Sequence, residues 1–459
     1  MATNGKNTGN KHVSLNLNIR GISQSPTLAI NELSKKLAAK GTTIYPMGLG
    51  QSPFPVPSSV VEELKAHAHE KDYLNVKGLE ALRQAVAYFH KQKNKVDIKA
   101  NHVLIGPGSK ELMFILQMVY YGELILPTPC WVSYVPQAKI IGRNIKLIHT
   151  SQENKWRITH KQLSDFLLKE NDTYKPRLLI LNYPSNPDGG TYSGNELKKI
   201  AQVARKHELI ILSDEIYSEL HYKGEHVSIA EFYPEGTIIS SGLSKWCGAG
   251  GWRLGTFAFP PNFEWLLNAM AAVASETYTS VCAPIQYAAI KAFKGGVVIE
   301  RYLRHVRRIL AHLSQQCATI LKESGISVNS PDGAFYFFID FTACSSRLNA
   351  KGIYDSHTLC EQLLKETGVA ILPGEAFMRS AEELTARLAF VNFDGTQAIA
   401  KSETFPLSQN LPDNFAELYC PDTINGMKKI AAWVQEKSID EVQQKQSLQY
   451  LKDEIPLLH

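Results

Sequence analysis

The chain has 459 residues, 44% of them hydrophobic and 20% charged, a balance that is ordinary for a globular enzyme with two or three core-sized units. Its net charge is only +5 and it contains no dense Lys/Arg run, so the sequence gives no support for nucleic-acid binding. Seven scattered cysteines favour reduced thiols in a cytoplasmic protein over a disulfide framework or a metal site, and no apolar run is long enough for a membrane span.

The N-terminal part of the chain is polar and then rich in proline. Residues 1–14 lack the apolar core of a signal peptide and are expected to be disordered. Residues 15–70 are expected to form an N-terminal arm and part of a small domain. Within them, the Pro-rich segment 52–57 is predicted to be extended rather than helical.

Short β-branched runs alternate with amphipathic segments along the middle of the chain. This alternation is typical of a parallel sheet covered by helices, and it predicts a large α/β domain over residues 71–300. The predicted strands cover residues 103–105, 123–126, 178–181, 209–212, 237–240 and 254–259.

A smaller α+β domain is predicted over residues 301–436. The segment 299–323 has helical spacing and is expected to connect the two domains. Three apolar runs, at 335–341, 369–372 and 387–393, are the predicted strands of the smaller domain. Residues 437–459 are predicted to be a polar helical tail that carries no chemistry.

A glycine-rich turn, Gly106 to Lys110, follows the first predicted strand and precedes the apolar-periodic segment 112–118. Backbone N–H groups at the N-terminus of a helix would suit a phosphate group. Such turns are common without any ligand. Gly108, Ser109 and Lys110 are therefore candidates for binding a phosphate group only if another phosphate-binding residue lies beside them.

Two further motifs fall at the carboxyl ends of predicted strands, where open α/β sheets bind ligands. Asp214 ends an apolar strand, and an unpaired buried carboxylate is costly, so it needs a partner. The interval from Asn186 to Asp214 fits one strand–helix–strand crossover, which would place the two side by side. Taken alone, Asp214 and Tyr217 would also fit a helix N-cap and a structural tyrosine.

The segment 241–255 places Lys245 in a turn of small residues, with Arg253 eight positions later. An isolated lysine is most often a solvated loop residue. Here the small residues permit close approach of the backbone, and the planar fork of Arg253 suits phosphate oxygens.

The run from Gly242 to Gly255 resembles the pyridoxal-phosphate attachment signature of class I/II aminotransferases, the aspartate aminotransferase family of fold type I. The resemblance implies a mainly parallel central sheet in a large domain and a smaller α+β domain. It implies that Lys245 forms a Schiff base with pyridoxal 5'-phosphate and acts as the catalytic base. Arg253 would hold the phosphate with Gly108, Ser109 and Lys110. Gly242 stands where many members have Ser or Thr, and Ser241 or Ser244 are the alternatives for that ligand.

The same resemblance assigns the residues around the cofactor ring. Trp131, in the segment 127–134, falls where the family stacks an aromatic residue on the pyridine ring. Asn186 and Tyr217 would contact the phenolic oxygen. Asp214 would pair with the protonated ring nitrogen, which keeps the ring an electron sink.

Substrate and subunit contacts are also implied. Arg387, expected at the start of a strand, aligns with the arginine that binds the substrate α-carboxylate, for which a bidentate fork is suited. Asn186 and the backbone of Gly48 are further substrate-binding candidates. Tyr73 aligns with a tyrosine that reaches the phosphate of the neighbouring subunit, which predicts a homodimer with composite active sites.

The resulting hypothesis is a cytoplasmic aminotransferase that moves an amino group between an L-amino acid and a 2-oxo acid by a ping-pong mechanism. The donor is open. The segment 276–280 lacks the arginine of many dicarboxylate-specific relatives, but Lys110 stands where one branch binds the distal carboxylate. Tyr45, Phe54 and Tyr278 would instead favour an aromatic side chain. Aspartate or an aromatic donor with 2-oxoglutarate is favoured.

A lyase, synthase or oxidase of the same fold is the alternative, because each can use the same substrate carbanion. The segment 394–424 is longer and more polar than a minimal family C-terminus, and reshaping of the pocket entrance is one role considered for it.

Overall fold

The computed structural model describes residues 16–19, 26–169 and 175–435. The expectations for residues 1–14 and for the tail 437–459 lie outside these ranges. Within the described ranges, no helix combines the length and apolar character that crossing a membrane requires.

The larger sheet has seven strands in the order β2-β8-β7-β6-β5-β3-β4. β8 runs antiparallel to both of its neighbours, and the other pairs are parallel, so the predicted mainly parallel α/β sheet is confirmed. The strands are β2 (Val103–Gly106), β3 (Glu123–Thr128), β4 (Ile145–His149), β5 (Arg177–Asn182), β6 (Ile210–Asp214), β7 (Thr237–Gly242) and β8 (Gly255–Ala258).

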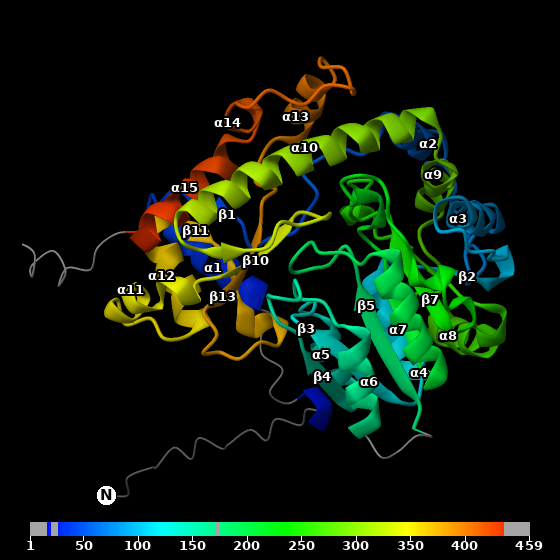
Figure 1. Cartoon of the computed structure of the whole chain (residues 1–459). Helices are drawn as coiled ribbons and strands as arrows, with labels where there is room; N and C mark the ends of the chain where they lie inside the picture. The colour runs from blue at the N-terminus through cyan, green and yellow to red at the C-terminus, as the bar shows by residue number, and fades with distance from the viewer. Residues whose placement is uncertain (1–15, 20–25, 170–174, 436–459) are drawn as a thin grey trace, which may run out of the picture.

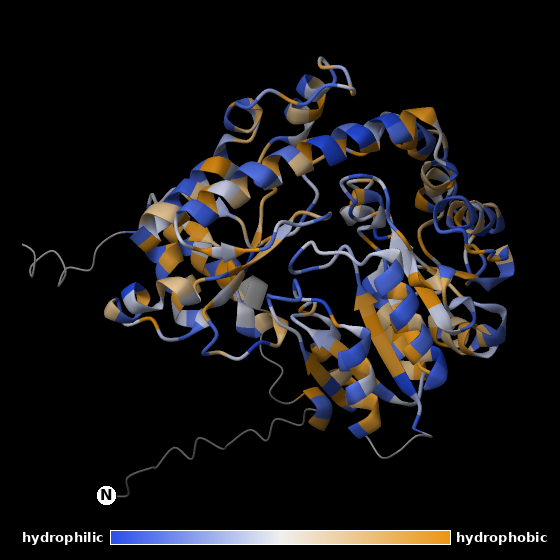
Figure 2. Cartoon of the chain, viewed as in Figure 1, coloured by the Kyte–Doolittle hydropathy of each residue, from blue (hydrophilic) through white to orange (hydrophobic). Residues whose placement is uncertain are grey.

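Alternating side chains of the sheet belong to two different hydrophobic clusters. Leu178 and Ile180 of β5 pack in the cluster formed with α4 (Ser109–Val119), α5 (Tyr134–Ile140) and α8 (Glu264–Thr277). Leu179 and Leu181 pack in the cluster formed with α6 (His160–Lys169) and α7 (Gly194–Lys206). Helices thus cover both faces, as the period of two in a strand requires. Figure 2 shows the hydrophobic β5 beside the largely hydrophilic outer side of α7.

β4 was not among the strands predicted from the sequence. It lies at the edge of the sheet, paired with β3 alone, and only Ile148 of its five residues is buried. Lys146 and His149 interrupt its apolar character. An edge strand needs less hydrophobic surface than a central one, so its sequence signal is weak.

A second group of helices packs beside the N-terminal end of the long helix α10 (Val297–Glu323). α2 (Ser58–Ala66) and α3 (Glu80–Lys93) both contact α9 (Ala283–Lys294). The segment 52–57 that precedes α2 is not helical, as expected from its prolines.

The smaller unit contains two sheets. One is antiparallel, with the order β12-β13-β10-β9, and in the other β1 pairs in parallel with β11. Its strands are β1 (Tyr45–Pro46), β9 (Ser327–Val328), β10 (Tyr336–Asp340), β11 (Val369–Ala370), β12 (Leu372–Pro373) and β13 (Thr385–Ala389), and its helices are α1 (Pro26–Ala38), α11 (Ser345–Ala350), α12 (Ser356–Thr367), α13 (Gly395–Ser402), α14 (Phe415–Tyr419) and α15 (Pro421–Gln435).

The helix α10 (Val297–Glu323) joins the two units, in agreement with the predicted helical segment. Figure 1 shows it passing from α9, near the larger sheet, to α15, near the smaller one. The domain limits 71–300 and 301–436 remain predictions. α1 contacts α12 whereas α2 contacts α9, so the described part of 15–70 is shared between the two units.

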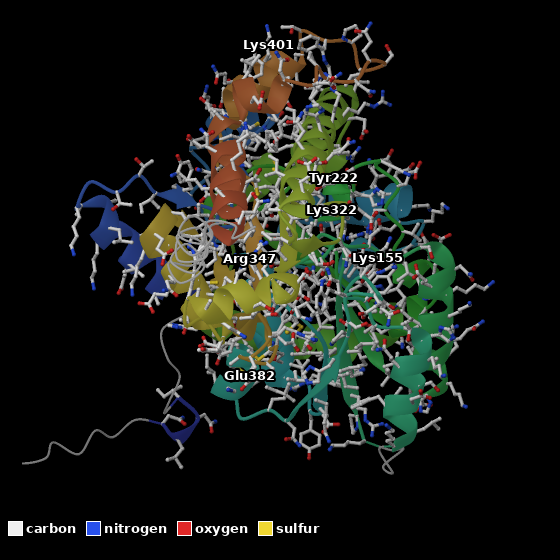
Figure 3. All side chains as sticks on the ribbon, turned by 60° about the vertical axis from the view of Figure 1, so that its left-hand side comes forward. Lys155, Tyr222, Lys322, Arg347, Glu382 and Lys401 are labelled. Atoms are coloured by element: carbon white, nitrogen blue, oxygen red, sulfur yellow. The ribbon has the colours of Figure 1, made fainter. Side chains whose placement is uncertain are left out.

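The segment 394–424 packs against the outer side of α10. Arg308 of α10 donates hydrogen bonds to the carbonyl oxygens of Ser402, Phe405, Pro406 and Gln409. Figure 3 places Lys401, on α13, at the opposite end of the molecule from Glu382. No residue of 394–424 lines the cavity around Lys245, and a role of the segment at its entrance stays a prediction.

Candidate active site

A cavity of about 540 Å³ lies at the carboxyl ends of the parallel strands. Asn182 ends β5, Asp214 ends β6, and Lys245 follows the end of β7. Nine of the residues predicted from the sequence line this cavity: Ser109, Lys110, Trp131, Asn186, Asp214, Tyr217, Ser244, Lys245 and Arg253. The larger sheet therefore brings together side chains from segments up to about 140 residues apart in the sequence, as expected for an α/β fold.

Lys245 lies between the two units of the protein. Its Nζ donates a hydrogen bond of 2.6 Å to the carbonyl oxygen of Gly50. The same atom is 5.5 Å from the ring centre of Tyr217 and 5.7 Å from that of Phe335. The amine is held by one backbone acceptor and two aromatic faces, with no carboxylate paired to it among the described residues.

The N-terminus of α4 and the loop after β7 create a cationic end of the cavity. Arg253 adopts a left-handed φ of 55° and donates to the carbonyl oxygens of Gly250 and Pro107 at 3.0 and 3.3 Å. Glycine is favoured at position 108 because its φ is +91°, and a Cβ there would also lie 2.3 Å from Nη2 of Arg253 and force the guanidinium to move. Burial, and then the charges of Arg253 and Lys245, lower the pKa of Lys110. Three cations and a helix N-terminus form a cradle that fits a phosphate.

Gly242 has no hydroxyl that could bind a phosphate, and Ser241 and Ser244 are the alternatives. Of these two serines, Ser244 lines the cavity. Ser241 is buried within β7, where it pairs with Thr256 of β8. The geometry therefore favours Ser244 as the hydroxyl available to a phosphate.

Asp214 is a buried carboxylate without a cationic partner among the described residues. It is 3% exposed and accepts hydrogen bonds from the hydroxyls of Tyr134 at 2.6 Å and Ser240 at 3.4 Å. Burial raises its pKa to about 6. A cationic group in the cavity, such as a protonated pyridine nitrogen, would relieve the cost of this buried charge.

Trp131 provides a large aromatic face at the wall of the cavity. The Nζ of Lys110 lies 5.1 Å from its ring centre, and the ring of Tyr134 meets it edge-on at 5.2 Å. Tyr134 also donates a hydrogen bond to Asp214, so the same tyrosine contacts both the Trp131 ring and the Asp214 carboxylate.

Arg387 does not begin a strand, as the sequence had suggested, but is the third residue of β13. The strand starts at Thr385 because Thr385 and Ala386 already pair with β10. Nor does its side chain line the Lys245 cavity. It is 4% exposed, with its guanidinium 4.9 Å from the ring centre of Tyr336.

The partners of Arg387 explain how it is connected to the cavity. Nη1 donates to Oδ1 of Asn186 at 3.0 Å, and Nη2 donates to the carbonyl oxygen of Gly48. Gly48 thus contacts Arg387 and does not line the cavity, where Gly50 and Gln51 are found instead. Nε of Arg387 is buried without a partner among the described residues, and the two bonds above use two of the five N–H donors, so three donors remain for a carboxylate.

Tyr336 is a residue of this site that the sequence did not reveal. Its hydroxyl lies 2.8 Å from the hydroxyl of Tyr217 and 3.4 Å from the carbonyl oxygen of Gly50. Burial, followed by the contact with Tyr336, raises the pKa of Tyr217 well above its ordinary value. A Cβ at Gly50 would lie only 1.8 Å from the Tyr336 hydroxyl, so the absence of a side chain there permits this arrangement.

A polar cluster behind Asp214 was also missed. Glu215, the next residue, is 1% exposed and accepts hydrogen bonds from Asn94 and Ser213 at 2.9 and 2.8 Å. It also accepts one from Ser228 and lies 3.0 Å from Nε2 of His226. Burial alone would raise the pKa of Glu215, but His226 and the hydroxyls hold it below its ordinary value.

Tyr73 lies outside the cavity and is 90% exposed. Its expected contact would be made in another subunit, so a single chain leaves that role a prediction. Among the described residues, no three His, Cys, Asp or Glu side chains are grouped as metal ligands.

Comparison with known proteins gives concordant results. Residues 42–391 match the family model described as aminotransferase class I and II. An aspartate aminotransferase of Bacillus sp. (strain YM-2) is 32% identical over 78% of this chain and 91% of its own length. An asparagine–oxo-acid transaminase of Streptococcus mutans is 31% identical over 77% of this chain and 89% of its own.

Among solved structures, aspartate aminotransferase from Thermus thermophilus with maleate superimposes with a TM-score of 0.74. It is 25% identical in sequence, and the match covers 85% of this chain and 98% of that one. Aspartate aminotransferases are fold type I proteins, so the predicted fold type is confirmed. The family match spans both the lysine-bearing cavity and β13, and the chain therefore belongs to the class I and II aminotransferases.

Proposed function

We propose that this transaminase holds pyridoxal 5'-phosphate in the Lys245 cavity and exchanges amino groups between aspartate or an aromatic amino acid and 2-oxoglutarate. The single observation that carries the proposal is that one cavity has a positively charged end and a negatively charged end. A cationic cradle lies at Arg253, Lys110 and Ser109, and a buried carboxylate without a cation lies at Asp214.

Each end of the cavity matches one part of the cofactor. Ser109, Ser244 and Arg253 would hold the phosphate, and Trp131 would cover one face of the ring. Asp214 would pair with the ring nitrogen. When bound, the cofactor supplies an electron sink that stabilises negative charge at the substrate Cα.

The residues of the chain then bind and orient the substrate. The remaining N–H donors of Arg387 are suited to the α-carboxylate, and Asn186 links Arg387 to the cavity. Fixing the carboxylate selects which bond at Cα is broken. The Nζ of Lys245 takes the proton from Cα and returns it, because an amine within the cavity is the nearest general base. A ping-pong mechanism repeats these steps in reverse with the 2-oxo acid.

Support for a dicarboxylic substrate comes from Lys110. Its Nζ lies at the wall of the cavity against Trp131, where it could pair with a distal carboxylate. Two of the relatives named above are an aspartate aminotransferase and an asparagine–oxo-acid transaminase.

We further propose a cytoplasmic homodimer in which Tyr73 completes the site of the neighbouring subunit. The 90% exposed ring of Tyr73 supports this, because a large aromatic side chain in full contact with water lacks a partner within its own chain.

A half-reaction screen tests the proposed function. The purified protein, loaded with pyridoxal 5'-phosphate, is mixed with one amino acid at a time in the absence of any 2-oxo acid. We expect aspartate or an aromatic amino acid to release one equivalent of its 2-oxo acid per site, since no acceptor is present to restart the cycle. Release of many equivalents without an acceptor, or of none from either class of amino acid, would contradict the proposal.

A further inference from the structure

A second cavity, of about 610 Å³, lies apart from the Lys245 cavity and shares no lining residue with it. It is bounded by the C-terminal ends of α3 and α9, by the N-terminal turns of α10, and by Leu407 from the loop between α13 and α14. Pockets for small molecules occupy about 300–1,000 Å³, so this volume is sufficient for a two-ring compound.

The inner wall of the second cavity is largely apolar and aromatic. Phe89, Ala292, Phe293 and Leu303 line it and are buried. Trp246 also lines it, is 2% exposed, and has an indole Nε1 with no hydrogen-bond partner among the described residues. Its Nε1 atom is itself buried, so the cavity meets the indole ring and not the N–H group.

The two carboxylates at this cavity are already paired. Glu219 lies 3.1 Å from Nη2 of Arg307 and 3.4 Å from Nζ of Lys93. Glu300 lies 3.0 Å from Nη1 of Arg307 and 3.3 Å from Nζ of Lys93. Neither carboxylate is therefore available to neutralise a further cation at the cavity.

The mouth of the cavity, in contrast, carries exposed cations. Lys294 and Arg301 line it, and no ion pair is formed by either among the described residues. They flank the first turn of α10, whose N–H groups add a partial positive charge. An anion is the ligand charge that this end favours.

We propose that this cavity binds a small carboxylate with an aromatic body, with the ring system against Phe293, Leu303 and the indole of Trp246 and the carboxylate towards Lys294 and Arg301. The position suggests a regulatory role for the bound molecule. Trp246 directly follows Lys245, and Glu219 lies two residues after Tyr217, so both walls continue into the Lys245 site.

The test uses 2-naphthoate as the probe and the full-length protein loaded with pyridoxal 5'-phosphate. Binding is followed by calorimetry and by the indole N–H resonances of the protein's six tryptophans. We expect one site per chain at which the resonance assigned to Trp246, through its absence in Trp246→Phe, shifts on binding. A wild-type protein that does not bind 2-naphthoate at millimolar concentration, or that binds it without shifting this resonance, overturns the proposal.

Amino-acid substitutions test where on the protein 2-naphthoate binds. Ala292→Leu fills the apolar wall and should weaken binding about tenfold, and Arg301→Glu should weaken it about fivefold. Lys322→Glu makes the same charge change near the other end of α10, as Figure 3 shows for Lys322, and should leave the affinity unchanged. Arg301 is exposed, so its replacement is informative even if Ala292→Leu does not fold.

An Arg387→Ala variant distinguishes binding of 2-naphthoate in the second cavity from binding near Lys245. The site that shifts Trp246 should remain in this variant, because Arg387 lies outside the second cavity. Loss of that site in Arg387→Ala, or equal affinity in wild type and Arg301→Glu, overturns the assignment.

Discussion

Arg387 and Asn186, which are 201 residues apart in the sequence, share a buried hydrogen bond of 3.0 Å between Nη1 and Oδ1. The bond joins β13 of the smaller unit to the turn after β5 of the larger one. It commits the amide oxygen of Asn186, so its Nδ2 is the group that a molecule in the cavity could use. The residue proposed to bind the substrate and a residue proposed to bind the cofactor are therefore one connected unit.

Replacement of Arg387 by alanine should raise the KM for the amino donor by roughly 100-fold or more, because charge-assisted hydrogen bonds contribute about 1.5–3 kcal/mol each. Cofactor affinity should change much less. Steady-state kinetics and equilibrium dialysis of the cofactor measure the two effects. Arg205→Ala is the matched control, since Arg205 forms an exposed pair with Glu235, and it should stay within twofold of wild type. An unchanged KM in Arg387→Ala would show that another residue binds the carboxylate.

Lys245→Ala should abolish covalent attachment of pyridoxal 5'-phosphate. After borohydride reduction, mass spectrometry of wild-type peptides should find the added group on Lys245. Lys110→Ala is the control, because Lys110 lines the same cavity and should leave the labelling of Lys245 intact. Labelling of a different lysine in wild type would refute the assignment.

Asp214→Asn should make the cofactor-free protein more stable at pH 8 but not at pH 4. Burial raises the pKa of Asp214 from 3.8 to about 6, so the unfolded state loses its proton first as the pH rises. Between pH 4 and pH 8, wild type should lose about 2 kcal/mol of unfolding free energy through this carboxyl, and the variant should not show this loss. Urea denaturation at both pH values measures this. Parallel pH profiles of the two proteins would show that Asp214 has an ordinary pKa.

Lys110→Met should alter substrate preference. If Lys110 pairs with a distal carboxylate, kcat/KM for aspartate should fall by roughly 10- to 100-fold, the equivalent of one charged hydrogen bond. Activity with phenylalanine should change by no more than about threefold. Competition assays with both donors give the ratio directly, at saturating cofactor. Equal losses for the two donors would assign Lys110 to the phosphate alone.

The cluster behind Asp214 should be important for stability. Removing one partner of the buried pair, as in His226→Ala, leaves the charge of Glu215 unpaired and should cost about 3–5 kcal/mol. The double variant with Glu215→Gln should lose less than the sum of the two single losses. Because the pKa of Glu215 is held low, its contribution is present above pH 4.5 and is lost as the pH falls. Additive losses in urea denaturation would show that the two residues act independently.

The residues proposed to hold the cofactor could be placed together from the sequence because they lie in short turns at strand ends. Lys245, Asp214 and Ser109 each follow or end a recognisable apolar run, and parallel strands bring such turns to one edge of the sheet. The interval from Asn186 to Asp214 predicted one strand–helix–strand crossover, and β5, α7 and β6 form it, with both residues lining the same cavity.

The substrate side could not be predicted equally well. Tyr336 lies in a strand of consecutive aromatic residues, and no local pattern distinguishes it from Phe335 or Phe337 in the core. Its contact with Tyr217 spans 119 residues and depends on how the two units meet. For Arg387, the sequence indicated the residue but not its strand position, because Thr385 and Ala386 carry little hydrophobic signal.

The close approach of Gly50 and Tyr336 makes these two positions dependent on each other in evolution. A first substitution at position 50 would collide with the tyrosine ring and displace the carbonyl oxygen that accepts from Lys245. A side chain at position 50 becomes tolerable only after position 336 has been reduced in size. The order of substitution is therefore fixed, and descendants of this chain should retain Gly50 for as long as they retain Tyr336.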